Sequence, residues 1–533
     1  MARENSCCRA CCRGLYACQW RSSHENKSKQ ACCWYIVVTL VSLLSLCWMY
    51  ICLVIYNDQD DVNWKVFTIL KQWVNWSMVL IITYAVLTSY CILLLLFALF
   101  HAALGEQLNL HWLHKIFLCL GGTLTVTGIV VLSYIRREQW SAVRLSLEAT
   151  APFLQFGAVG ALTLLSSFVF HCFHRVKCAG SKVLIAVVFV AVSAAIFLCP
   201  IFIRSPCLIE WSELPDKPKL IGHRGAPMLA PENTMMSFNR SIACGVTAFE
   251  TDVQLSNDSI PFLMHDNESD FLLRTTNVKE KFPRTNFNNS TSLTWEVLQS
   301  LNAGEWFLKT DPFNSVSQLS EEEKETARKQ TIPSLYQLLI LAKQHSISVI
   351  FDLYSPNPER DAKDTVKAIL DSKIDPSLIL WLPPVNMTDQ GFIQVYKSTT
   401  EMRKHGENHL NAKYSELTTD EIRELRRDNV TVNLWVVNER WLFSLLWCAG
   451  ASSVTTNSCH LLKEVDRPDW TLSHLQYKII WISVDLVSFL IMIGLYIFQR
   501  KKHSLCPRRG TEQQRSNTSA SNEKDVPLLS FTA

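Results

Sequence analysis

Six long apolar runs constrain the fold of this chain more than any other feature of its sequence. Each has about the 20 residues that a helix needs to cross a bilayer, and none shows the polar face of a core helix. The runs are Trp34–Tyr56, Met78–Ala103, Ile116–Tyr134, Pro152–Phe170, Val183–Phe202 and Ile479–Phe498. With 48% hydrophobic residues over 533 positions, the chain is predicted to be a six-span membrane protein with one large polar domain before its last span.

Basic residues beside the outermost runs predict the orientation. By the positive-inside rule, they place both termini in the cytoplasm. These residues are Arg3, Arg9, Arg13, Arg21, Lys27 and Lys29 before the first run, and Arg500, Lys501, Lys502, Arg508 and Arg509 after the last. Five crossings then place Arg204–Lys478 outside. The loop expected to carry Arg136, Arg137 and Arg144 disagrees with the rule, because it would also lie outside.

The same reasoning predicts the order of the domains. Residues 1–33 form a cysteine-rich cytoplasmic leader, 34–203 five spans, 204–478 an extracellular domain, 479–498 the sixth span, and 499–533 a polar, disordered cytoplasmic tail. No cleavable signal is expected, since the first apolar run is full length and would itself serve as the targeting signal. The expected location is the plasma membrane. A net charge of +3 gives no reason to expect nucleic acid as a partner.

Cysteines and glycosylation sequons differ between the leader and the outer domain. The leader cysteines are candidates for S-palmitoylation, with zinc binding and ordinary thiols left open: Cys7, Cys8, Cys11, Cys12, Cys18, Cys32 and Cys33. Four cysteines of the outer domain allow three disulfide pairings, and the sequence does not choose among them: Cys207, Cys244, Cys448 and Cys459. The candidate glycosylation sites are Asn288, Asn386 and Asn429.

The segment from residue 221 to 266 carries the residues best suited to chemistry. Glu250 and Asp252 are two positions apart, so on an extended strand both carboxylates face one side and could bind a hard divalent cation. His223 and His265 each end an apolar run and could exchange protons with a phosphate ester at neutral pH. The plainer interpretation is that the histidines are structural and the carboxylates form salt bridges with Arg224. The combination favours a phosphodiesterase.

The outer domain alternates short apolar runs with helical patterns, which predicts a (β/α)8 TIM barrel. The expected strands are Lys219–Gly222, Thr247–Val253, Ile260–His265, Ser348–Leu353, Leu378–Leu382, His409–Lys413, Val430–Val437 and Ser453–Thr456. The gap between the second and third runs is too short for a helical crossover, so an antiparallel hairpin is expected there. Asp266–Thr331 is too long for a loop and is predicted to be an inserted element.

The motifs now described resemble those of the glycerophosphodiester phosphodiesterase (GDPD) family. The matching segments are Gly222-His223-Arg224-Gly225, Pro231-Glu232-Asn233-Thr234, Glu250-Thr251-Asp252, Met264-His265-Asp266, Arg274-Thr275-Thr276 and, more weakly, Ala303-Gly304-Glu305-Trp306-Phe307, Ile332-Pro333-Ser334-Leu335 and Trp435-Val436-Val437-Asn438. The six-span layout is similar to the transmembrane branch of that family. The resemblance implies a phospholipase-C-like TIM barrel and metal-dependent hydrolysis of glycerophosphoinositol to glycerol and inositol phosphate.

The resemblance also implies a role for individual residues. They are His223 and His265 as the acid–base pair, Arg224 for phosphate binding, and Glu250, Asp252 and Asp352 as ligands of one divalent cation, Ca²⁺ or alternatively Mg²⁺. Asp352 stands where the family has glutamate, and it could instead cap a helix. Tyr354 replaces the family lysine, which removes a positive charge, and Asn457 stands where a late family motif ends in aspartate.

Other functions remain open at this stage. A barrel tethered by six spans could cleave GPI anchors in the manner of a phospholipase C, because tethering raises the effective concentration of lipid-anchored substrates. The two departures from the family motifs leave room for a catalytically silent signalling or binding domain. A transporter is disfavoured, because the spans carry few charged residues near their centres.

Overall fold

The computed structural model describes residues 29–55, 72–104, 110–135, 139–176, 178–265, 269–284, 289–354, 357–383 and 390–505, with a few isolated positions between them. The leader cysteines up to Cys18, the sequons at Asn288 and Asn386, and the tail beyond residue 505 lie outside the described residues. The chain forms two compact units, residues 1–149 with 206–472 and residues 150–205 with 473–533.

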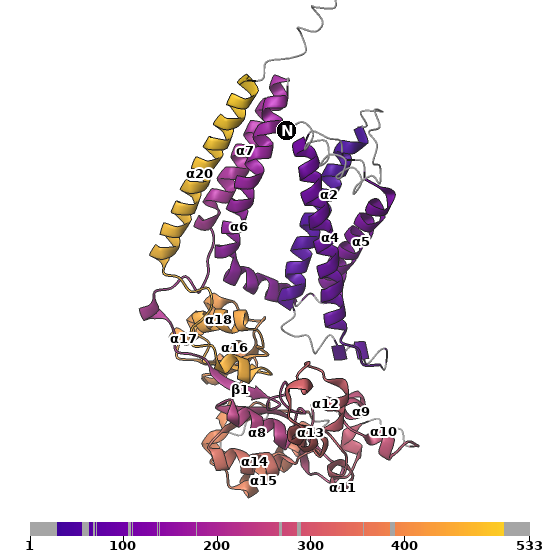
Figure 1. Ribbon diagram of the computed structural model, residues 1–533. Helices are drawn as coiled ribbons and strands as arrows, with labels where there is room; N and C mark the ends of the chain where they lie inside the picture. The colour runs from indigo at the N-terminus through magenta and orange to yellow at the C-terminus, as the bar shows by residue number, and fades with distance from the viewer. Residues whose placement is uncertain are drawn as a thin grey trace, which may run out of the picture. The chain divides into compact units, whose positions relative to one another are not determined.

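Six helices among the described residues are long and apolar enough to cross a membrane (Figure 1). They are α2 (Lys29–Val54), α4 (Trp76–Leu104), α5 (Trp112–Ile135), α6 (Gln139–Arg175), α7 (Ala179–Leu198) and α20 (His474–Leu505). The expectation that Arg144 lies in a loop is wrong, because α6 already begins at Gln139. All six apolar runs are helical, as predicted.

Side-chain hydrogen bonds join helices inside each unit. In the first unit, Ser42 of α2 donates to the Cys91 carbonyl of α4 at 2.8 Å. In the second, the hydroxyls of Thr163 (α6) and Ser488 (α20) lie 2.6 Å apart, and Trp481 Nε1 donates to the Phe197 carbonyl of α7 at 2.9 Å. Such bonds give direction to helix contacts that apolar surfaces alone specify poorly in lipid.

The polar domain is a parallel barrel, as predicted. Its strands in spatial order are β6 (Ile393–Gln394), β5 (Ile379–Trp381), β4 (Ser348–Leu353), β2 (Ala248–Leu255), β1 (Lys219–His223), β9 (Ser453–Thr456), β8 (Thr431–Trp435) and β7 (His409–Lys413). Tyr396 closes the ring: its N–H donates to the His409 carbonyl at 3.0 Å, and its carbonyl accepts from the Asn411 N–H at 2.8 Å. Large buried side chains, among them Phe249 and Trp381, fill the core.

Two local features of the barrel test the strand assignments. The strand β3 (Pro261–Leu263) pairs antiparallel with β2, which confirms the predicted hairpin. The barrel strand β6 was missed, because only two residues form its regular ladder and its apolar run is short. The eight expected runs therefore supplied seven barrel strands and the hairpin strand.

Seven helices of the described part of the chain follow strands of the barrel or the inserted element. They are α8 (Met235–Ala243), α14 (Leu335–His345), α15 (Pro358–Ser372), α16 (Thr399–His405), α17 (Thr419–Arg427), α18 (Arg440–Ala449) and α19 (Cys459–Lys463). Thr418 and Glu421 form a reciprocal capping box at the start of α17, and Ser334 with Gln337 does the same for α14. Each box satisfies two backbone N–H groups that a helix start leaves unpaired.

The segment between β3 and α14 is an inserted element with its own small core. Its helices are α9 (Ser269–Thr275), α10 (Val278–Lys281), α11 (Trp295–Gln299), α12 (Glu305–Thr310) and α13 (Glu321–Arg328). Phe271, Leu298 and Ile332 are buried together there. Trp306 and Phe307 are also buried, so these aromatic side chains pack inside the insert.

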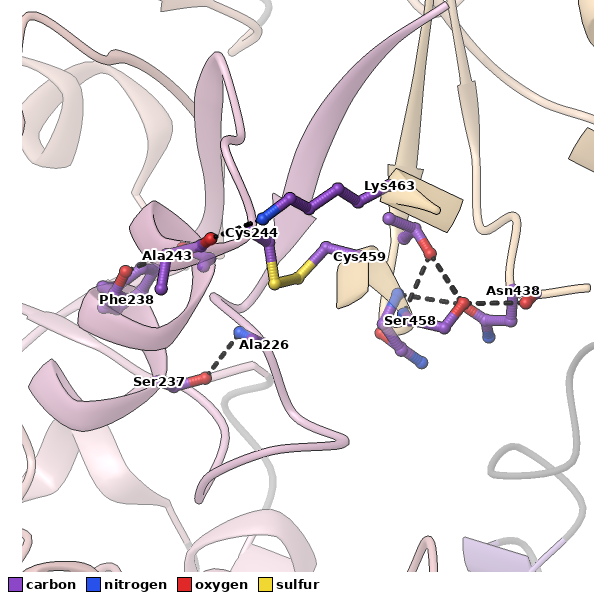
Figure 2. Close-up of a disulfide and its surroundings, with 12 residues drawn as sticks. Ala226, Ser237, Phe238, Ala243, Cys244, Asn438, Ser458, Cys459 and Lys463 are labelled. Carbon is purple, nitrogen blue, oxygen red and sulfur yellow. Dashed lines mark hydrogen bonds between the residues drawn. A yellow bond between two sulfur atoms is a disulfide. The ribbon is translucent and has the colours of Figure 1, made fainter. Parts of the chain in front are cut away.

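Two disulfides select one of the three possible pairings: Cys207 with Cys448, and Cys244 with Cys459. Figure 2 shows the second bond joining the end of α8 to the start of α19, beside the Lys463 amine that donates to the Ala243 carbonyl at 3.2 Å. The bonds link positions 241 and 215 residues apart. Long closures of this kind typically stabilise a fold by about 2–4 kcal/mol.

Candidate active site

A tight turn after β1 fixes the backbone of Arg224. Arg224 and Gly225 have φ angles of 53° and 87°. A Cβ on Gly225 would lie 2.5 Å from the Ser237 hydroxyl, so a side chain there would clash. The Arg224 N–H lies 2.9 Å from the Glu250 carbonyl oxygen and 3.1 Å from Glu250 Oε2. The neighbouring strand β2 therefore holds this turn through one glutamate.

Two carboxylates orient the Arg224 guanidinium. Its Nη1 lies 2.7 Å from Glu232 Oε2, and its Nε lies 3.2 Å from Asp252 Oδ2. Glu232 is shared, since its Oε1 accepts from Arg274 Nη1 at 2.9 Å. Burial acts to raise the pKa of Glu232, but the Arg274 and Arg224 charges outweigh it and lower the pKa to about 2. Glu232 is therefore ionised at neutral pH and holds both guanidinium groups.

His223 is fixed through its Nδ1 atom. Asn457, which directly follows β9, places its Oδ1 2.5 Å from His223 Nδ1. Because an amide oxygen only accepts, Nδ1 carries the proton and Nε2 keeps a lone pair. Nε2 lies 3.8 Å from Glu250 Oε2. Burial lowers the pKa of His223, and the Arg224 charge lowers it further, to about 3. The imidazole is thus neutral at neutral pH.

His265 follows β3 and lies between two aromatic rings. Its ring centroid is 5.4 Å from those of Phe271 and Tyr354. Tyr354 Oη lies 3.4 Å from His265 Nε2. Burial raises the pKa of Tyr354, and the Asp252 and Asp352 carboxylates add to this, so the phenol stays protonated. The residue that stands at the family lysine position therefore contacts the second histidine.

Three carboxylates gather on adjacent strands of the barrel. Asp252 of β2 is paired in register with Asp352 of β4, and Glu250 lies two residues before Asp252. Burial raises the pKa of Glu250 well above its usual value, and the Asp252 charge raises it further. Burial also raises the pKa of Asp252, although Arg224 opposes the shift. A divalent cation would relieve this repulsion between buried like charges.

The carboxylates fit a hard cation by chemistry, but they are not already spaced as a metal site. Within the described part of the chain, no group of three or more His, Cys, Asp or Glu side chains is arranged to hold a metal ion. Cationic side chains contact two of the three carboxylates instead: Arg224 lies against Asp252, and Lys397 Nζ lies 2.7 Å from Asp352 Oδ1. The salt bridge considered as the plainer interpretation is thus present for Asp252. Asp352 is not a helix cap, because the N-cap of α15 is Asn357.

The structure brings all six proposed site residues to one end of the barrel and adds others. Glu232 and Asn233 belong to a motif that matched the family, yet sequence reasoning gave them no role; Asn233 donates to Asp252 Oδ2 at 3.3 Å. Asn457 was regarded only as a departure, and it orients His223. Lys397 had no signal in the sequence, because a single lysine after a weak strand resembles any exposed lysine.

Comparisons with known proteins identify the family of this chain. Residues 223–377 match the model of the glycerophosphoryl diester phosphodiesterase family. The chain is 41% identical over 521 residues to glycerophosphoinositol inositolphosphodiesterase GDPD2 of Mus musculus, covering 94% of this chain and 95% of that protein. The chain belongs to the glycerophosphoryl diester phosphodiesterase family. It is therefore a phosphodiesterase, and the prediction of an enzyme is confirmed.

Two further proteins illustrate what the chain is similar to. Glycerophosphodiester phosphodiesterase domain-containing protein 5 of Gallus gallus is 38% identical over 515 residues, covering 93% of this chain and 85% of that protein. Among solved structures, an Oleispira antarctica phosphodiesterase in complex with the product sn-glycerol-3-phosphate is 20% identical, covers 48% of this chain and 97% of its own, and has a TM-score of 0.37.

Proposed function

We propose that this family member is a metal-dependent ecto-phosphodiesterase that hydrolyses glycerophosphoinositol to glycerol and inositol phosphate. One observation carries the proposal: the ends of neighbouring strands bring together two imidazoles, an arginine and three carboxylates. Active sites of barrels of this kind form at the C-terminal ends of their strands. The printed name of the mouse relative supports the choice of substrate.

The geometry supports distinct roles for the two histidines. His223 Nε2 accepts the proton of the attacking oxygen, since its Nδ1 already carries a proton held by Asn457. The attacking oxygen belongs to water, or to an inositol hydroxyl that first forms a cyclic phosphate, which water then hydrolyses to inositol phosphate. A new P–O bond forms, the P–O bond to glycerol breaks, and His265 donates a proton to the glycerol oxygen. Arg224 stabilises the negative charge on the phosphate.

Glu250, Asp252 and Asp352 are the residues that would hold the cation. Ca²⁺ suits three carboxylates that differ in burial, because it tolerates irregular coordination by oxygen, whereas Mg²⁺ demands a stricter geometry. When bound, the cation supplies positive charge at a non-bridging phosphate oxygen.

Several observations support placing the barrel outside the plasma membrane, with both termini in the cytoplasm. Two disulfides lie in this domain, and such bonds persist in oxidising compartments. The sequon residue Asn429 is exposed after α17, where a glycan could be attached. The basic residues at both ends of the chain favour the same orientation.

One experiment tests the substrate and the placement together. Intact cells that express the full-length chain should release inositol phosphate from glycerophosphoinositol added to the medium, and cells that express His265→Ala should not. Product that forms only after the cells are permeabilised would contradict the extracellular placement. No product in either condition would contradict the substrate. Release of a GPI-anchored reporter, without turnover of the soluble diester, would support the anchor-cleaving alternative.

The contact between His223 and Asn457 predicts a shift in pH dependence. A carboxylate beside Nδ1 stabilises the imidazolium, so Asn457→Asp should raise the pKa of His223 from its depressed value. Because His223 must be neutral to accept a proton, the acidic limb of the kcat/KM profile should move to higher pH. The measurement is a pH–rate profile of both proteins.

The control is an Asn→Asp change away from the site. Asn438→Asp is not suitable, because the Asn438 side chain accepts from the Asn457 backbone N–H. Asn239→Asp, on the exposed face of α8, is suitable. Identical profiles for wild type and Asn457→Asp would contradict the prediction.

A further inference from the structure

Lys397 occupies a position at the barrel mouth that the catalytic roles above do not use. It lies three residues after β6, and Val395 and Tyr396 between them continue the ladder by bonding to the strands on either side. The lysine therefore stands where a barrel strand ends, on the face where functional side chains gather. Its Nζ lies 2.7 Å from Asp352 Oδ1, at the end of β4.

The cations of this site differ in how firmly they are held. The Arg224 side chain is 14% exposed and has two carboxylate partners, and the Arg274 side chain is 8% exposed and pairs with the buried Glu232. The Lys397 side chain is 59% exposed and pairs with Asp352, whose side chain is 31% exposed. A flexible ammonium at the rim can change partners at little cost, whereas a buried guanidinium with two partners cannot.

We propose that Lys397 is a substrate-binding residue whose ammonium contacts the anionic phosphate of the diester. The proposal rests on the proposed function, in which Asp352 binds a divalent cation. A cation at Asp352 would repel the ammonium and take over its partner. The substrate phosphate would then be the nearest anion available to the lysine. Tyr354, which directly follows β4, offers the phosphate only a neutral hydroxyl. Lys397 therefore supplies a positive charge that Tyr354 does not.

Charge removal at Lys397 tests this role. In the full-length protein in detergent, Lys397→Gln should raise the KM for glycerophosphoinositol about tenfold and leave kcat nearly unchanged, as expected for one lost charge-assisted contact. Lys397→Arg should restore most of the affinity. Lys404→Gln, which removes an exposed lysine from the nearby helix α16, should match wild type and controls for net charge.

A binding measurement separates this proposal from the proposed function. Calorimetric titration of inositol phosphate, the phosphate-bearing product of the proposed reaction, into the Ca²⁺-loaded protein should show about tenfold weaker binding for Lys397→Gln, with Ca²⁺ affinity undiminished. Equal affinity of wild type and Lys397→Gln for this ligand would overturn the role of Lys397, even if glycerophosphoinositol is hydrolysed. If wild type binds the ligand through Lys397 but does not hydrolyse glycerophosphoinositol, the proposed substrate fails and the role of Lys397 stands.

Discussion

Turnover of glycerophosphoinositol should fall by about 10²–10⁴-fold when either His223 or His265 is replaced by alanine, the range expected when a positioned acid or base is lost. The histidines come from different strands and are held differently, His223 by Asn457 and His265 by Phe271 and Tyr354. Neither can take over the role of the other. The measurement is the initial rate of inositol phosphate release by the purified full-length protein.

The controls for this prediction come from the same chain. His345→Ala removes an exposed histidine at the end of α14 and should leave the rate unchanged. The double variant His223→Ala/His265→Ala should lose little more than either single variant, because an acid and a base that act in one transition state are not additive. A single variant that keeps more than about a tenth of the wild-type rate would contradict its assigned role.

Chelation should remove activity almost completely, and Ca²⁺ should restore it. The same addition should raise the thermal unfolding midpoint, since a ligand at 100 times its dissociation constant stabilises the native state by about 2.7 kcal/mol. The physical reason is the repulsion among Glu250, Asp252 and Asp352. In the metal-free protein, burial and the neighbouring carboxylates raise the pKa of Glu250 and of Asp252, and a bound cation would offset this unfavourable ionisation. The measurements are the rate and the unfolding midpoint after treatment with EGTA, with and without added Ca²⁺ or Mg²⁺.

The stabilisation by Ca²⁺ should depend on pH with a definite sign. The folded-state pKa of Glu250 is raised, so the folded state binds its proton more tightly than the unfolded state does. The stability contributed by this protonation is fully present below the unfolded pKa and is lost as the pH rises through the folded pKa. Cation binding requires the ionised carboxylate, so the increase in the midpoint should be larger at neutral pH than near the ordinary pKa of glutamate.

Variants identify which carboxylates are responsible. Glu250→Gln and Asp252→Asn should each remove most of the Ca²⁺-dependent shift in the unfolding midpoint. Glu325→Gln, on the exposed surface of α13, should keep the full shift. Full activity in EGTA, together with an unfolding midpoint that does not respond to Ca²⁺, would contradict metal dependence.

Local patterns predicted the parts of the fold that depend on neighbouring residues. The hairpin of β2 and β3 was predicted from the short distance between two apolar runs, and the structure confirms it. The strand β6 was missed because local patterns need several residues, and its regular ladder is too short to leave a periodic pattern. Arg274 entered the sequence analysis only as part of a matching motif, and the structure shows that it pairs with Glu232.

The sequence by itself determined the six apolar helices, the parallel barrel and the six residues proposed for chemistry, because hydropathy, periodicity and motif order are local properties of the chain. Only the tertiary structure decided how the cysteines pair and that Glu232 binds both Arg224 and Arg274. It also decided that Asn457 orients His223 and that Lys397 contacts Asp352. Asn457 lies 234 residues from His223. The physical reason is strand register: it alone determines which strand ends meet at the mouth of the barrel, and therefore which distant side chains come within bonding distance.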